Sequence, residues 1–276
     1  MGFSDRKHRG LWLSDRRLVP AGGLDLSQTL FKMEDFIADH IAEDATVAVN
    51  QAGTAITAAA ISATAGAPKA GHGGWIAGAT DDVDANIVDE VALGVKPWLQ
   101  PDAIRSNERL FCEFGFVVPT ALTARRYFFG FSDDETEGTG DNPIVITSGT
   151  TITATADDAA GLIFSSGATD VNGFYMGAVK ATVVGTAVLS ADGSLDTVAV
   201  DNYIKLRVEA DSDGDVYFWG AEDTGTLNRA VEPVFLGAQA AAITADILYI
   251  PIFSASTTAA TSVEWEIDYI FGAGPV

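Results

Sequence analysis

The feature that most constrains this chain is a strict alternation of apolar and polar residues in its second half. The stretch 203–210, YIKLRVEA, is the clearest case, with Ile204, Leu206, Val208 and Ala210 on one side and Tyr203, Lys205, Arg207 and Glu209 on the other. Successive side chains of a β-strand point to opposite faces, whereas a helix repeats every 3.6 residues. The stretch therefore predicts a strand with one face in a core.

The same alternation recurs in further stretches, at 108–119, 125–133, 215–221, 247–255 and 262–272. The first places Leu110, Cys112, Phe114, Phe116 and Val118 on one face, and the second does so with Tyr127, Phe129 and Phe131. The last predicts one face made of Val263, Trp265, Ile267, Tyr269 and Phe271. Gly-, Asp- or Ser-rich breaks separate these stretches, and no helical pattern intervenes. We therefore predict an all-β fold, an antiparallel β-sandwich or barrel.

One helix is predicted, near the N-terminus. Leu26, Leu30, Met33, Ile37 and Ile41 fall close to helical spacing, and the preceding residues include Pro and Gly breakers. We expect an extended arm, then one short α-helix whose apolar stripe makes oligomer contacts through Leu30, Met33, Ile37 and Ile41. This divides the chain into residues 1–45, for anchoring and oligomer contact, and residues 46–276, the sandwich domain.

Charge is distributed unevenly along the 276 residues. The chain has 38 acidic and 16 basic residues and a net charge of −22, which makes nucleic-acid binding unlikely to be its role. Residues 1–17 nevertheless hold five basic and two acidic residues. We expect this basic arm to contact a partner through Arg6, Lys7, Arg9, Trp12, Arg16 and Arg17. The alternative is a solvated tail.

Composition argues against several other classes. The single cysteine, Cys112, lies in an apolar strand-like stretch, so a disulfide framework and a zinc site are excluded and a buried free thiol is expected. No apolar run has the length of a membrane span, and the first residues, MGFSDRKHRGLW, contain no apolar stretch of the kind found in secretion signals. The three histidines, His8, His40 and His72, lie in separate segments without a catalytic motif. We expect no catalytic residue, no metal and no cofactor.

The motif DSDGD resembles a calcium-binding loop. Asp211, Asp213, Asp215 and Glu222 fit positions 1, 3, 5 and 12 of the helix–loop–helix calcium motif, but its sixth position is Val216 where that motif needs Gly. Alternating strands flank the motif on both sides. A β-hairpin is therefore the favoured interpretation, although a loosely held surface cation stays open.

The hairpin carries a register prediction. Because Asp213-Gly214 favours a two-residue turn, we expect Ala210 opposite Tyr217 and Val208 opposite Trp219, with Trp219 inside. A three-residue loop would instead place Phe218 opposite Ala210 and turn Trp219 outward, since a slip of one residue exchanges the two faces.

Two further acidic groups offer candidate sites. The loop SDDETEGTGDNP, residues 132–143, has carboxylates that could ligate calcium or line a sugar-binding edge, although a hydrated hairpin tip is the favoured interpretation. Glu264 and Glu266 flank Trp265 and could form a carboxylate pair for glycoside hydrolysis. The same alternation is typical of any half-exposed strand, so the simple strand is favoured there.

About the last 170 residues resemble the concanavalin A-like (laminin G-like) jelly-roll sandwiches. The resemblance rests on the segments RRYFFGFSD, NYIKLRVEADSDGDVYFW and SVEWEIDYIFG. Together with the Ala/Thr/Gly-rich composition and the N-terminal arm, it extends to bacteriophage virion proteins, in particular capsid decoration (cement) or head-fibre proteins. Lectins of this fold hold calcium and sugar through an ordered Asp/Asn cluster, and no such cluster can be aligned here.

The resemblance implies a non-enzymatic virion protein on the capsid exterior that stabilises the capsid through its arm. The implied partners are the major capsid protein and sister subunits in a homotrimer, with no membrane and no nucleic acid. The alternative is a glycan- or receptor-binding module of a phage fibre or tail, with or without calcium. A β-sandwich glycan hydrolase or lyase is the third hypothesis.

Overall fold

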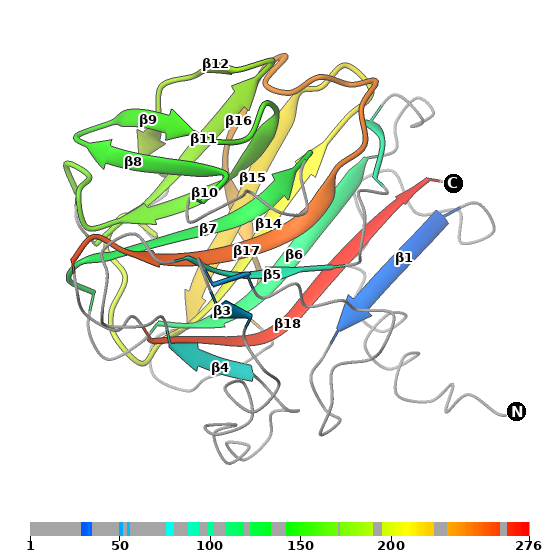
Figure 1. The fold of residues 1–276 in the computed structure, drawn as a ribbon. Helices are drawn as coiled ribbons and strands as arrows, with labels where there is room; N and C mark the ends of the chain where they lie inside the picture. The colour runs from blue at the N-terminus through cyan, green and yellow to red at the C-terminus, as the bar shows by residue number, and fades with distance from the viewer. Residues whose placement is uncertain are drawn as a thin grey trace, which may run out of the picture.

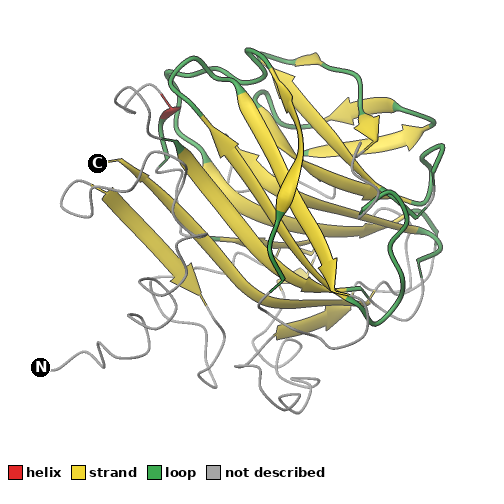
Figure 2. Ribbon diagram, turned by 180° about the vertical axis from the view of Figure 1, so that it is seen from behind, coloured by secondary structure: helices red, strands yellow, loops and turns green. Residues whose placement is uncertain are grey.

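The computed structural model describes two antiparallel sheets packed face to face (Figure 1). The described residues are 29–34, 50–51, 54–55, 76–79, 88–93, 99–101, 109–118, 122–133, 142–170, 172–189, 195–223, 231–259 and 264–275. Strands make up nearly all of their regular structure (Figure 2). The predicted all-β antiparallel sandwich of the jelly-roll type is confirmed.

The first sheet has seven strands in the order β1–β18–β6–β14–β15–β16, with β4 also paired to β18. Their bounds are β1 Thr29–Glu34, β4 Ile76–Ala79, β6 Leu110–Val117, β14 Tyr203–Ala210, β15 Val216–Asp223, β16 Val234–Gln239 and β18 Glu264–Pro275. Apart from the consecutive strands β14, β15 and β16, neighbouring strands are far apart in sequence, so long-range pairing holds the rest of the sheet.

The second sheet also has seven strands, in the order β12–β11–β10–β7–β17–β5, with β13 paired to β11. Their bounds are β5 Val88–Ala92, β7 Arg125–Ser132, β10 Ala159–Ser165, β11 Phe174–Lys180, β12 Val183–Val184, β13 Val188–Leu189 and β17 Ile250–Thr257. Two separate hairpins join β2 (Asn50–Gln51) to β3 (Thr54–Ala55) and β8 (Ile144–Ser148) to β9 (Thr151–Ala154).

The main core lies between the sheets and contains the faces that alternation predicts. The inward residues of β6, β7 and β14 belong to one buried cluster, and the ring centroids of Phe116 and Phe129 lie 4.9 Å apart. Cys112 is a buried free thiol within this cluster, as expected. Each large side chain here contributes roughly 1.5–3 kcal/mol by leaving water, so this core provides the main driving force for folding.

The predicted helix near the N-terminus is wrong for residues 29–34, which form strand β1. This strand pairs along the edge of β18, with Leu30 opposite Gly274 and Met33 opposite Phe271 (Figure 1). Over so few residues the apolar spacing fits both the helical period and the strand period. The edge of β18 supplies hydrogen-bond partners that favour the strand. Ile37 and Ile41 lie outside the described residues, so the oligomer contacts and the boundary at residue 45 stay predictions.

A β-bulge at Asp268 overturns part of the face predicted for residues 262–272. Ile267 pairs with Phe116 and Tyr269 with Gly115, so Asp268 is the extra residue between them. Trp265 and Ile267 face the core as predicted, but Tyr269 and Phe271 lie on the opposite face. A bulge inserts one residue and so inverts the alternation after it.

The DSDGD motif forms a β-hairpin, as favoured, but the predicted two-residue turn is wrong. Asp211 and Asp215 flank a three-residue loop that ends on Gly214, which has a φ of 78°. Val208 consequently stands opposite Phe218 and Arg207 opposite Trp219. Trp219 therefore lies outside the core, although Phe218 is not opposite Ala210 as a three-residue loop was expected to place it.

Within the described residues, no helix is long and apolar enough to cross a membrane.

Candidate functional site

The outer face of the second sheet is covered by its own hairpin. Between β7 and β10, which are neighbours in the sheet, the chain leaves to form the β8–β9 hairpin. Its Ile144, Ile146 and Ile152 join a buried cluster with Phe128 and Ile163 of the sheet. This face is therefore a second apolar core rather than an open groove in the described part of the chain.

The turn of this hairpin is docked onto the loop between β10 and β11. The backbone N–H of Gly149 donates to the carbonyl of Gly167 at 3.1 Å, and the N–H of Thr169 donates back to the carbonyl of Gly149 at 2.9 Å. Gly149 has a φ of 63°, in the left-handed region that glycine adopts without steric cost. Two loops about 20 residues apart in sequence thus form one continuous surface.

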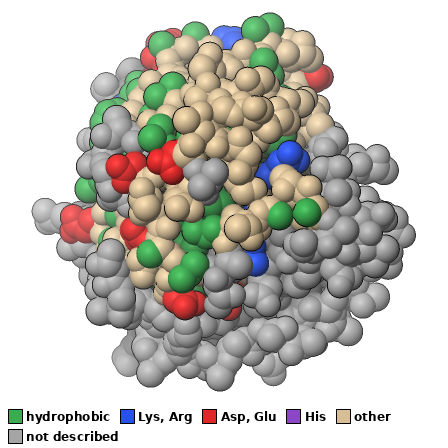
Figure 3. All heavy atoms as spheres, turned by 90° about the vertical axis from the view of Figure 1, so that its left-hand side faces the viewer, with side chains coloured by type: hydrophobic (Ala, Val, Ile, Leu, Met, Phe, Trp, Pro, Cys, Tyr) green, Lys and Arg blue, Asp and Glu red, His purple; other side chains and the backbone are tan. Residues whose placement is uncertain are grey.

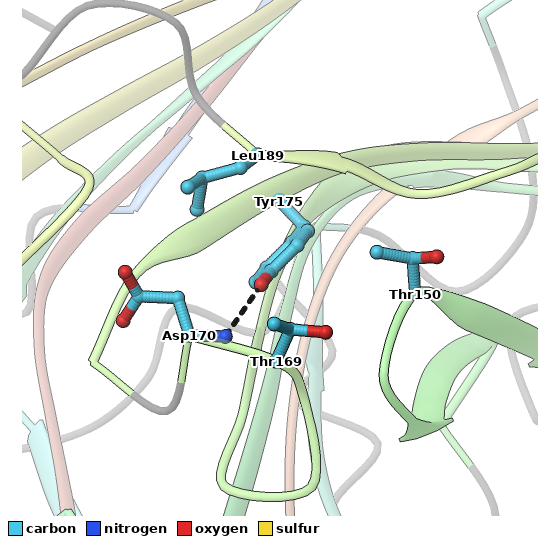
Figure 4. Close-up of a pocket in the computed structure, with 5 residues that line it drawn as sticks. All are labelled: Thr150, Thr169, Asp170, Tyr175 and Leu189. Atoms are coloured by element: carbon cyan, nitrogen blue, oxygen red, sulfur yellow. Dashed lines mark hydrogen bonds between the residues drawn. The ribbon is translucent and has the colours of Figure 1, made fainter.

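A pocket of about 550 Å³ opens between these loops and β13 (Figure 4). We call it the threonine pocket, and its lining residues are Thr150, Thr169, Asp170, Tyr175 and Leu189. Tyr175 projects from β11 and is buried, while the two threonines are exposed. The lining therefore combines an aromatic ring and a leucine with hydroxyl groups and one carboxylate.

Hydrogen bonds fix the polar side of the threonine pocket. The N–H of Asp170 donates to the Tyr175 hydroxyl oxygen at 2.8 Å, which leaves the phenol proton available to another acceptor (Figure 4). The carboxylate oxygen Oδ1 of Asp170 accepts from the N–H of Asn172 at 3.1 Å. Its Oδ2 can accept a hydrogen bond from a ligand, and Thr150 and Thr169 can each donate one and accept others. This arrangement suits a neutral molecule that carries several hydroxyl groups.

On the side of the molecule that bears the β8–β9 hairpin, acidic side chains form separate small groups rather than a continuous band (Figure 3). Asp133 lies close to Asp157 and Asp158, and its Oδ1 accepts the N–H of Asp158 at 3.2 Å. Asp158 is buried and accepts the N–H of Ala181 at 2.9 Å and that of Thr244 at 2.8 Å. Burial raises the pKa of Asp133, and the charges of Asp158 and Asp157 raise it further. Asp158 thus links three segments of the chain, those around residues 158, 181 and 244.

The outer face of the first sheet contains a different arrangement, a charged cluster of Glu113, Arg207, Glu209, Arg109 and Tyr269. The Nε and Nη2 atoms of Arg207 both donate to Oε2 of the fully buried Glu113, the first at 2.9 Å. Burial alone would lower the pKa of Arg207, but Glu113 and then Glu209 hold it above its usual value. The Tyr269 hydroxyl donates to the other oxygen of Glu113. These groups satisfy one another, so the cluster is structural.

The carboxylates of the DSDGD hairpin are likewise used by the fold. Asp211 accepts the N–H groups of Asp213 and Asp215 at 3.0 and 3.1 Å and the Tyr217 hydroxyl at 2.9 Å. Glu222 lies near the far end of β15, where it accepts from the N–H of Ala199. Glu222, at position 12 of the calcium motif, therefore lies a whole strand away from Asp211 at position 1. Among the described residues, no group of three or more His, Cys, Asp or Glu is placed to hold a metal ion.

The other predicted site residues are only partly tested. The arm contacts Arg6, Lys7, Arg9, Trp12, Arg16 and Arg17 lie outside the described residues, as does most of the 132–143 loop. Glu264 and Glu266 lie on β18, paired with Ala79 and Ala77 of β4. The threonine pocket was not found from the sequence, because isolated Thr and Asp residues in polar turns give no pattern.

No protein-family model and no curated protein sequence matches the chain. Among solved structures, it is similar to a protein of unknown function from Shewanella oneidensis MR-1, at 14% identity and a TM-score of 0.57, covering 100% of this chain and 96% of that one. Arcelin-5, a lectin-like defence protein from Phaseolus vulgaris, gives 9% identity, a TM-score of 0.47 and coverage of 90% and 100%. A glycoside hydrolase family 16 endo-glucanase from Bacteroides ovatus gives 11% identity, a TM-score of 0.45 and coverage of 90% and 95%.

The first of these similarities shows a shared fold and nothing about activity, and the other two, with TM-scores below 0.5, add no argument to it. The two packed antiparallel sheets agree with the sandwich fold that the resemblance implies, and membership of the concanavalin A-like group stays a prediction. Nothing in the comparisons indicates a virion protein, so that part of the resemblance stays a prediction.

Proposed function

We propose that this chain is a non-enzymatic glycan-binding module and that the threonine pocket takes a neutral sugar. The observation that carries the proposal is the lining of the pocket, which combines hydroxyl groups and one carboxylate with Leu189 and Tyr175. Ligand sites combine apolar surface with a few fixed polar groups. A sugar ring offers both a C–H face and several hydroxyl groups.

The charge of the chain favours a neutral ligand over an acidic one. Asp170 contributes a negative charge at the pocket, and the net charge of −22 repels anionic glycans over a longer range. The number of carboxyl groups in the pocket supports binding rather than hydrolysis. Glycosidases flank the scissile bond with two carboxyl groups, whereas the lining of the threonine pocket contains one.

The test is a glycan array followed by calorimetry on the retained sugars, each with and without a chelator. We expect neutral glycans to bind with Kd values of about 10 µM to 1 mM, and Asp170→Asn to weaken binding about tenfold. The asparagine still offers Oδ1 to the N–H of Asn172, so the loop keeps its cap. Asp246→Asn, an exposed residue outside the pocket lining, is the matched control and should bind like the parent.

Two results would contradict this proposal. One is that no glycan is retained in either buffer, and the other is that Asp170→Asn and Asp246→Asn bind equally well. Binding that is lost only in chelator would assign the site to the calcium-dependent form of the hypothesis.

Capsid decoration remains a second proposal, supported by the basic arm on an acidic chain. Its arm is expected to dock on an acidic lattice through the six residues named above. Deleting residues 1–24 and measuring binding to undecorated capsids tests it, because unchanged binding would remove the anchoring role of the arm.

A further inference from the structure

The buried hydroxyl of Tyr175 has a proton that no group in the described part of the chain accepts. Only 1% of the side chain of Tyr175 is exposed, and it lines the threonine pocket. Its oxygen accepts the N–H of Asp170 at 2.8 Å, and this is the one hydrogen bond of the hydroxyl among the described residues. Buried hydroxyl groups normally use their proton as well. The Tyr175 hydroxyl is therefore a hydrogen-bond donor for a molecule in the pocket.

The complementary acceptor is the carboxylate of Asp170. Its Oδ1 accepts the N–H of Asn172 at 3.1 Å, whereas its Oδ2 has no hydrogen bond within the described residues. Because the N–H of Asp170 is bonded to the Tyr175 oxygen, this carboxylate and the phenol proton belong to the same part of the pocket (Figure 4). We call this part, formed by Asp170 and Tyr175, the polar corner. It offers a ligand one donor and one acceptor.

An apolar side chain lies next to the polar corner. Leu189 of β13 stands opposite Tyr175 of β11 in antiparallel pairing, so the two side chains lie side by side on one face. Its Cδ1 also lies over Gly173, where an added Cβ would be only 2.8 Å away. Glycine at this position thus lets Leu189 approach the loop that carries Asp170. In Figure 4, Leu189 and Asp170 lie on one side of the Tyr175 ring and Thr150 on the other, so apolar surface adjoins both polar groups.

We infer that the threonine pocket selects an N-acetylated sugar and that the polar corner binds its acetamido group. An acetamido group combines an N–H donor, a carbonyl acceptor and a methyl group in one planar unit. These match the carboxylate of Asp170, the phenol proton of Tyr175 and the apolar surface of Leu189, in that order. A sugar hydroxyl in the same place has no methyl group to bury against leucine. The inference rests on the proposed glycan-binding function and specifies its ligand class.

The rest of the lining favours a sugar as the carrier of this group. Thr150 and Thr169 are exposed at the pocket, and each has a hydroxyl that can bond the hydroxyl groups of a sugar ring. An acetylated lysine side chain carries the same amide on an apolar stem and would leave both threonines unused. The acetamido group is also neutral, so the net charge of −22 does not repel it.

Calorimetry on the full chain with matched sugars tests the inference. N-acetylglucosamine is compared with glucose and N-acetylgalactosamine with galactose, so that the orientation of the 4-hydroxyl does not decide the result. We expect each acetamido sugar to bind about tenfold more tightly than its parent hexose, because it adds hydrogen bonds and a buried methyl group. N-formylglucosamine, which lacks only the methyl group, should bind with intermediate affinity. Nε-acetyl-lysine should bind about tenfold more weakly than the acetamido sugars.

Two variants test whether the polar corner and Leu189 cause this preference. Tyr175→Phe removes the phenol donor and Leu189→Ala removes the apolar surface, and each should reduce the ratio of the two affinities by about threefold or more. A general loosening of the pocket would weaken hexoses and acetamido sugars equally and leave the ratio unchanged. The matched controls are Tyr217→Phe and Leu248→Ala, at residues outside the pocket lining, which should keep the ratio of the parent. Circular dichroism with thermal melting checks that each variant is folded.

The possible failures are distinguishable from one another. Equal affinity for acetamido sugars and hexoses, or binding of other glycans only, overturns this inference but leaves glycan binding in place. A ratio that is unchanged in both Tyr175→Phe and Leu189→Ala overturns the role of the polar corner. Nε-acetyl-lysine that binds as tightly as the sugars would overturn the sugar as ligand in favour of acetylated peptides. If no glycan binds at all, this inference and the proposed function both fail.

Discussion

The outer faces of the two sheets are both buried, but by opposite chemistry. The second sheet is covered by the β8–β9 hairpin, whose isoleucines form an apolar cluster with Phe128 and Ile163. The first sheet instead buries the charged cluster, where Glu113 binds Arg207 and Tyr269. An apolar face tolerates small changes at a graded cost, whereas a buried ion pair depends on both partners being present. The two faces should therefore respond differently to substitution.

The largest expected effect is at Glu113. Glu113→Gln removes the carboxylate charge that binds the buried Arg207, and the next carboxylate, Glu209, lies farther away, with its Oε1 3.7 Å from Nη1. We therefore expect a loss of about 3–5 kcal/mol in the free energy of unfolding. Urea denaturation measures it. The matched control, Asp246→Asn at an exposed carboxylate, should stay within about 0.5 kcal/mol of the parent.

Replacing both members of the Glu113–Arg207 pair tests whether the loss of stability comes from leaving a buried charge unpaired. Glu113→Leu with Arg207→Leu should recover part of the loss, because a buried ion pair exchanged for apolar groups is close to neutral, whereas Tyr269 and Glu209 each lose one partner. A Glu113→Gln variant as stable as the control would show that the charged cluster does not hold the first sheet.

An intermediate effect is expected on the other face. Ile146→Ala, in strand β8, removes a fully buried side chain from the apolar cluster and should cost about 2–4 kcal/mol. Thr147→Ala, the next residue and exposed, should change the free energy of unfolding by less than about 0.5 kcal/mol. Equal stability of the two variants would mean that the hairpin is not part of the core.

The smallest effect concerns pH. The pKa of Asp133 is raised in the folded chain by burial and by Asp158 and Asp157, so its contribution to stability is complete below roughly pH 4 and is lost as the pH rises through the raised value. Asp133→Asn should therefore be more stable than the parent at pH 7, by less than about 1 kcal/mol because the group is only half-buried. The gain should vanish below pH 4. A gain that persists there would point to a cause other than ionisation.

Alternation predicts the core faces of β6, β7 and β14 because each of these strands runs without interruption and packs one face on the other sheet. It fails at Asp268, where a single extra residue inverts the faces, and at the DSDGD turn, where the loop is one residue longer than the dipeptide suggests. Both errors concern local register. A pattern of period two cannot detect one inserted residue.

The failure at residues 29–34 has another cause. Helical spacing there is a local property, whereas strand β1 exists because the edge of β18 lies beside it. The threonine pocket is beyond sequence reasoning for the same reason. Gly149 and Thr169 come into contact only when the hairpin folds back over the sheet, and no local sequence pattern predicts that contact.

The pairing of β1 with β18 also determines how the chain would respond to mechanical force. Thr29 stands opposite Pro275, so the outer ends of these two strands lie side by side. A force that separates residues 29 and 275 would act across the strands and break their hydrogen bonds one pair at a time, like a zipper. Strands whose pulled ends lie at opposite ends of a pair must instead break all their bonds together. Strand β1 should therefore peel away at low force while the rest of the sandwich stays folded.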